Sequence, residues 1–171
     1  MRRYLVPVAI AAVLCFATHA KAAVWTFPSI ILDGLQETPP VATTGTGVAT
    51  ATLDDVTGAF SVSGTFSNLI GTSNNFHLHG PAPPGTPAGV IAGLPFDFGV
   101  NSGNFGGNVV LSHANVAHVL AGNTYLNLHS TFRPGGEIRG QLLNPIPEPT
   151  TALLLASGVG GLFLLRRRSR R

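Results

Sequence analysis

Strict alternation of apolar and polar residues in two neighbouring segments is the feature that most constrains this fold. In "AFSVSGTF" (59–66), the phenylalanines and the valine occupy alternate positions, with hydroxyl side chains between them. "GVATATL" (47–53) alternates in the same way, and the intervening "DDVTG" (54–58) has the composition of a turn. Because successive side chains of a strand point to opposite faces, the pattern predicts an antiparallel hairpin with one buried face.

Further segments have the length and composition of short strands. They are "NFHLH" (75–79), "GVIAGL" (89–94), "GNVVL" (107–111), "TYLNLHSTF" (124–132) and "EIRGQLL" (137–143). "LSHANVAHVLAG" (111–122) instead spaces its apolar residues as a helix does, and Gly122 marks its end. Many short strands with Gly and Pro turns predict an all-β fold, an antiparallel β-sandwich or barrel with one short helix.

The N-terminus has the layout of a secretory signal peptide, predicted over residues 1–22. A basic start is followed by an apolar run (5–17) and by small residues at Ala20 and Ala22, where cleavage is expected. The alternative is a transmembrane anchor, for which the apolar run is short. Cys15, the single cysteine of the sequence, lies inside this run. Removal of the signal would leave a domain without thiols or disulfides.

A second apolar segment, residues 151–165, lies near the C-terminus and is followed by five arginines in the last six positions. As a helix it would span about 22 Å, which is short for a bilayer core of about 30 Å. Leucine-rich composition and a basic end nevertheless predict a transmembrane helix. The arginines would stay in the cytoplasm, with the preceding domain on the other side of the membrane.

This tail (146–171) resembles the PEP-CTERM sorting signal. It combines a Pro147-Glu148-Pro149 motif, a short hydrophobic segment and a terminal arginine cluster, in that order. The resemblance implies recognition by an exosortase in the inner membrane of a Gram-negative bacterium. The protein would then be released or attached at the cell surface or extracellular matrix, with exopolysaccharide or a surface protein as the implied partner. A permanent membrane anchor is the alternative.

The positive formal charge of +3 comes from the two terminal segments. Residues 24–145 retain Arg133 and Arg139 against six acidic residues, a net charge of −4. A mildly acidic domain has no basic patch for a phosphate backbone, so nucleic-acid binding is not expected.

Three histidines fall on matching faces of two predicted strands. His77 and His79 alternate with Phe76 and Leu78, and His129 alternates with leucines in "TYLNLHS". If the apolar residues face the core, the imidazoles point to the outer face, and they could meet if the two strands are neighbours. Neutral imidazoles bind copper and zinc well, so the sequence predicts a possible copper or zinc site. The alternative is a set of polar residues on a solvent-facing strand.

Other polar features predict structure rather than catalysis. Glu137 and Arg139 share one face of a predicted strand, which suits a polar strand pair. A catalytic carboxylate is less favoured because no partner acid is apparent. The proline-rich "GPAPPGTPAG" (80–89) cannot join a sheet as a central strand and is predicted to be an exposed loop beside the histidines.

The chain between the two terminal segments resembles the CHRD domain, named after chordin. Three blocks carry the resemblance: "LDGLQETPPVATTGTGVATATL", "FHLHGPAPPGTPAGVIAGL" and "LAGNTYLNLHSTFRPGGEIRGQL". It implies an exported domain (23–145) with an immunoglobulin-like or related all-β fold. The resemblance does not assign a biochemical role. The first hypothesis for the function is a non-catalytic surface or matrix module that binds protein or polysaccharide through outward strand faces and loops.

The arrangement also resembles Cu/Zn superoxide dismutase, an antiparallel β-barrel whose copper ligands include an H-x-H strand and a later strand histidine. Only His77, His79 and His129 can be carried over as copper ligands. The chain has no evident bridging histidine, zinc subsite or disulfide. The resemblance therefore implies copper or zinc binding as the alternative function, and dismutation is not expected.

Overall fold

The computed structural model describes residues 24–148. The predicted signal peptide (1–22) and the predicted C-terminal transmembrane helix (151–165) lie outside the described residues. Within 24–148, no helix is long and apolar enough to cross a membrane. The described residues form one compact unit by their own contacts.

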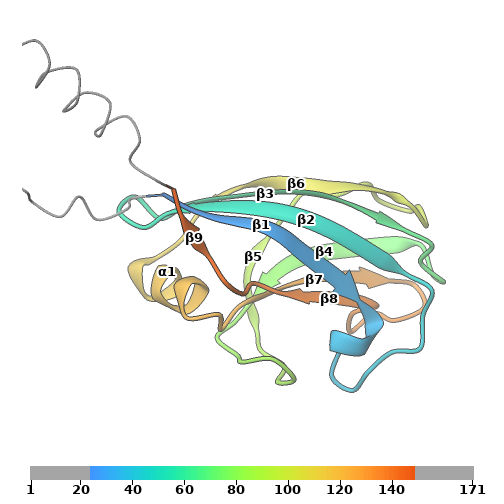
Figure 1. The fold of residues 1–171 in the computed structure, drawn as a ribbon. Helices are drawn as coiled ribbons and strands as arrows, with labels where there is room; N and C mark the ends of the chain where they lie inside the picture. Colours follow the sequence, from blue (N-terminus) through green and yellow to red (C-terminus); the bar gives the residue numbers. More distant parts are fainter. Residues whose placement is uncertain (1–23, 149–171) are drawn as a thin grey trace, which may run out of the picture. The chain divides into compact units, whose positions relative to one another are not determined.

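All strands of the described part belong to one antiparallel sheet. In chain order they are β1 (Val24–Asp33), β2 (Thr46–Asp54), β3 (Ala59–Ser67), β4 (Ser73–His79), β5 (Val90–Gly93), β6 (Gly103–Val110), β7 (Tyr125–Ser130), β8 (Ile138–Gln141) and β9 (Ile146–Pro147). Their spatial order is β5-β4-β7-β8-β1-β2-β3-β6, and β9 pairs with β1. A bridge between Phe96 and Phe105 joins the segment after β5 to β6, so the sheet nearly closes into a barrel. Figure 1 shows the resulting two layers, β1-β2-β3-β6 over β5-β4-β7-β8.

The predicted hairpin and the predicted helix are both confirmed. β2 and β3 pair over their whole length, with Leu53 opposite Phe60 at the turn. The helix α1 (His113–Leu120) begins after Ser112, whose hydroxyl accepts a hydrogen bond from the Asn115 amide at 3.3 Å. Gly122 follows the helix with φ of 74°, a conformation that glycine adopts without steric cost. The all-β fold class is therefore correct.

Strand β1 was not among the predicted strands because Pro28 and Ser29 interrupt its alternation. Phe27 and Ile30 are an odd number of residues apart, yet both are buried. A bulge explains this: Phe27 pairs with Ala51 and Ile30 with Ala49, so β1 carries one extra residue there. Pro28, which has no amide hydrogen, sits within the bulge, as is usual for proline in a sheet.

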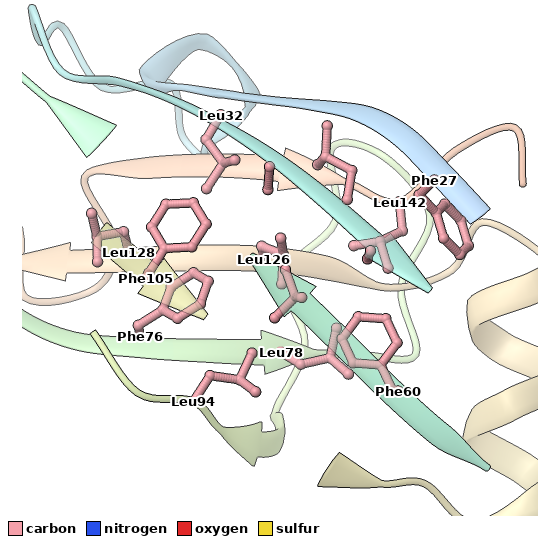
Figure 2. Packing of buried hydrophobic residues seen from close by; sticks show 14 of the residues in the cluster. Phe27, Leu32, Phe60, Phe76, Leu78, Leu94, Phe105, Leu126, Leu128 and Leu142 are labelled. Atoms are coloured by element: carbon pink, nitrogen blue, oxygen red, sulfur yellow. The ribbon is translucent and has the colours of Figure 1, made fainter. Parts of the chain in front are cut away.

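The core lies between the two layers and is built from the alternating apolar residues (Figure 2). Phe76 and Phe105 pack with ring centroids 4.4 Å apart, which joins the lower layer to the upper one. Leu126 and Leu128 of β7 are fully buried in this core. Their neighbours on β7 therefore face the opposite side of the sheet.

We expect Leu128→Ala to lower the free energy of unfolding by about 2–5 kcal/mol, because it leaves a cavity in the core. Leu35→Ala is the matched control, because Leu35 is 80% exposed and its loss should change stability by less than about 0.5 kcal/mol. Urea denaturation of both variants measures the difference. Equal destabilisation of the two would contradict the described core.

Candidate metal centre

The pairing of β4 with β7 brings the three predicted histidines together. Phe76 lies opposite Leu128 on the core face, and His77 lies opposite Asn127 on the other face. His129 is the next residue of that face along β7 and is therefore a diagonal neighbour of His77. One ring nitrogen from each of His77, His79 and His129 can be chosen so that all three atoms lie within 4.8 Å of one another.

The imidazoles are less exposed than the sequence predicted. They do point away from the apolar core, but His79 and His129 are only 7% and 8% exposed. Backbone from two loops contacts their rings: Ala88 lies in the proline-rich loop, and Pro134 lies between β7 and β8. The proline-rich loop is itself largely exposed, as predicted, although Ala82 within it is buried.

Backbone carbonyls fix the tautomers of two of the histidines. Nδ1 of His79 donates to the Ala88 carbonyl at 3.0 Å, and Nδ1 of His129 donates to the Pro134 carbonyl at 2.9 Å. A carbonyl can only accept, so Nδ1 carries the proton and Nε2 carries the lone pair in each neutral ring. Histidine metal ligands in proteins commonly show this arrangement, with the distal nitrogen held by a carbonyl or carboxylate.

The lone pair of His79 has no hydrogen-bond partner. Its Nε2 atom is buried and bonds to no group of the described chain. A buried polar atom without a partner costs about 1–3 kcal/mol, so its presence requires an explanation. A bound cation would supply the missing partner.

The ring of His77, the third histidine of the cluster, faces the ring of His129. Nδ1 of His77 lies 3.1 Å from Nε2 of His129. Because His129 offers a lone pair there, either a proton on His77 or a cation must lie between the two rings. Nitrogens bound to one zinc ion at about 2.0–2.1 Å lie no more than about 4.2 Å apart. The 3.1 Å between His77 Nδ1 and His129 Nε2 meets this limit. Any pair of ligand nitrogens between about 4.2 Å and the upper bound of 4.8 Å would need side-chain rotation to bind one ion.

Burial keeps the three rings in the form that binds metal. Desolvation lowers the pKa of His77, His79 and His129 below the usual imidazole value, and the neighbouring imidazoles contribute to the shift at His77 and His129. The three rings are therefore neutral near pH 7.

Tyr125 connects the proline-rich loop to His79. The two rings stack with centroids 5.0 Å apart and an interplanar angle of 10°. The Tyr125 hydroxyl accepts from the Ala88 amide at 3.0 Å and lies 3.3 Å from the Ala88 carbonyl, the same carbonyl that accepts from His79. Tyr125 thus positions both the ring of His79 and the group that fixes its tautomer.

Glu137 and Arg139, predicted as a polar strand pair, have separate partners in the described chain. The Glu137 carboxylate accepts hydrogen bonds from the Ile70 and Gly71 amides and from the hydroxyls of Thr43 and Ser130. It is fully buried and ties distant loops to the end of the sheet.

Arg139 is also buried, at 1% exposed. Its guanidinium donates to the Thr86 carbonyl at 3.0 Å and to Gln141 Oε1 at 2.7 Å, and its Cζ lies 3.6 Å from the centroid of the Tyr125 ring. Arg139 therefore holds the proline-rich loop over the polar face of the sheet.

Glu37 is a buried acid that the sequence patterns did not single out. It is 8% exposed, and its Oε1 atom has no hydrogen-bond partner. Desolvation raises the pKa of Glu37 to about 7, although Arg139, the Thr38 amide and Asn127 all act to lower it. Its position after the short helix η1 (Gly34–Gln36) has no periodic signature, so only the tertiary fold reveals its burial.

The residues of the predicted sorting motif and the two histidines near α1 are not part of the histidine cluster in the described chain. Pro147 belongs to β9, Glu148 follows it, and Pro149 lies outside the described residues. His113 is exposed at the start of α1, and neither it nor His118 belongs to the cluster.

Comparison with known protein families finds two matches. The family profile of the CHRD domain matches residues 29–142, and that of the PEP-CTERM protein-sorting motif matches residues 145–171. No curated protein and no solved structure matches the chain significantly.

We expect Glu37→Gln to change the pH dependence of stability. The folded state holds the Glu37 proton more tightly than the unfolded chain does, because the pKa is about 7 in the folded state and 4.5 without burial. The resulting stabilisation is fully present below pH 4.5 and is lost as the pH rises through about 7. Relative to wild type, the neutral Gln variant should gain up to about 3 kcal/mol of unfolding free energy between pH 4.5 and 8. Urea denaturation across this range measures the gain.

Glu148→Gln is the control, because this carboxylate is exposed at the edge of the sheet. A stability difference between wild type and Glu37→Gln that does not vary with pH would show that Glu37 ionises normally.

Proposed function

This chain belongs to the CHRD domain family and carries a PEP-CTERM sorting motif, and we propose that it is a non-catalytic cell-surface or matrix module that holds one copper or zinc ion. The sorting motif implies export, recognition by an exosortase and transient attachment to the membrane. The metal ion, the final surface or matrix location and the division into signal peptide, domain and sorting tail are parts of the proposal.

The observation that carries the proposal is the buried, unpartnered Nε2 of His79. One ring nitrogen from each of His77, His79 and His129 lies within 4.8 Å of the other two. Loop carbonyls hold His79 and His129 in the tautomer that leaves Nε2 free to bind a metal. The cluster is composed of imidazoles alone. Such a donor set suits copper or zinc better than magnesium or calcium, which prefer oxygen. Three nitrogen ligands leave a further coordination position for water or another ligand.

An exposed apolar pair supports a second binding surface on the same module. Ile31 of β1 and Val48 of β2 are direct cross-strand partners and are 55% and 48% exposed. We propose this face for contact with a surface protein, because exposed apolar side chains that adjoin one another favour association with another apolar surface.

We expect the domain (23–148) to bind one zinc or copper(II) ion per chain and His79→Ala to bind none at the same concentration. Bound metal raises the unfolding free energy by RT ln(1 + [M]/Kd), about 2.7 kcal/mol at a hundredfold excess over Kd. Isothermal titration and thermal denaturation with each metal measure the two effects. His113→Ala, at an exposed histidine of α1, is the matched control and should bind as wild type does. Equal uptake by wild type and His79→Ala would remove the site.

We expect Tyr125→Phe to weaken metal binding by about 10–100-fold without unfolding the domain, as is usual when the group that orients a ligand is lost. The phenyl ring keeps the stacking on His79, but the contacts of the hydroxyl with Ala88 are lost. Nitrogen-15 chemical shifts of the His79 ring report whether Nδ1 still carries the proton. Unchanged affinity and unchanged shifts would show that the hydroxyl does not position His79.

A further inference from the structure

The first residues of the sorting motif are part of the folded sheet. In β9, Ile146 pairs with Thr26 and Pro147 pairs with Trp25 of β1. The Glu148 amide then donates to the Val24 carbonyl at 3.0 Å, and the Thr26 hydroxyl donates to Glu148 Oε1 at 2.9 Å. The sheet therefore engages both the backbone and the carboxylate of the motif's central residue.

One edge of β1 is available for this contact because β8, its neighbour on that side, pairs only with the far end of the strand. On one side β1 pairs with β2 along nearly its whole length. On the other side β8 reaches only the far end of β1, where Asp33 pairs with Arg139. The backbone at residues 24–26 would be an unpaired edge without β9, and such an edge binds an extended peptide. Figure 1 shows β9 beside this end of β1.

The contact has the features of a reversible one. β9 is two residues long, and residues 146–148 are exposed to solvent. Pro147 has no amide hydrogen, so it contributes no donor to the ladder. A segment of this kind can leave the sheet without disturbing the core.

We propose that the edge of β1 at residues 24–26 is a binding site for the chain's own sorting motif and competes with the sorting enzyme for Glu148. An enzyme that reads Glu148 in the motif must first detach Glu148 from Val24 and Thr26. The folded domain thereby slows processing of its own tail. This inference rests on the sorting function above, but it is independent of the metal site.

A disulfide across the pair tests the competition in the full chain. Thr26→Cys with Ile146→Cys places thiols on directly paired residues, at a separation typical of disulfides, and the native sequence adds only Cys15 in the predicted signal peptide. The variants are expressed in a host that carries the sorting enzyme. The intact mass of the protein in the surface and membrane fractions shows whether its C-terminal tail is still attached. The double variant should keep its tail and lose it after dithiothreitol is added. Ile146→Cys alone should lose its tail as wild type does, and Thr26→Cys alone, which also lacks the hydroxyl that binds Glu148, should lose it faster. Processing of the oxidised double variant at the wild-type rate would overturn the inference.

A milder variant acts in the opposite direction and does not depend on disulfide formation. Thr26→Val keeps a β-branched strand residue but removes the hydroxyl that binds Glu148. Its tail should be lost faster than that of wild type, and hydrogen exchange at the Glu148 amide of the purified full chain should be faster.

Two results separate this inference from the sorting function. A wild-type chain that keeps its tail in the sorting host contradicts both. A wild-type chain that loses its tail, but whose Glu148 amide exchanges as fast as that of an unfolded peptide, contradicts the inference alone.

Discussion

The antiparallel pairing of β4 with β7 is the interaction on which the rest of the structure depends. Its register places Phe76 opposite Leu128 and Leu78 opposite Leu126, which commits one face of both strands to the core. Side chains alternate between faces, so the same register places the histidines on the other face. A shift of one residue in either strand would move leucines to the polar face and imidazoles into the core. The stability of the core therefore also fixes the spacing of the three imidazoles.

The polar face of these strands is buried, and this requires partners for its polar atoms. Loop carbonyls bind the Nδ1 atoms of His79 and His129, and loop amides bind Glu137. Arg139 binds the proline-rich loop in the same manner. The loops thus serve as a second, polar layer of the structure. A few buried polar atoms of the described chain lack a partner, among them His79 Nε2, Asn127 Oδ1 and Glu37 Oε1. They are informative because buried polar atoms in folded proteins generally have partners.

The sequence predicted those features that depend on neighbouring residues. Alternation identified the β2–β3 hairpin, and the faces of "NFHLH" and "TYLNLHS" placed three imidazoles on matching sides of two strands. Features that depend on distant segments were missed. The bulge at Pro28 interrupts the alternation of buried and exposed residues in β1, so the local pattern did not predict this strand. The pairing with β2 shows the extra residue that accounts for the interruption. The burial of His79, the environment of Glu37 and the separate partners of Glu137 and Arg139 arise from loops, whose paths no local pattern encodes.

The place of β1 within the sheet has a consequence for how this chain reaches its folded state. β1 is the first strand of the described chain, yet it lies between β2 and the late strands β8 and β9. A polypeptide that crosses a membrane from its N-terminus presents β1 long before its last partners emerge, and contacts so distant in sequence form slowly. Until then one side of β1 stays unpaired and can associate with other chains. Completion of the barrel therefore waits until β8 and β9 have emerged.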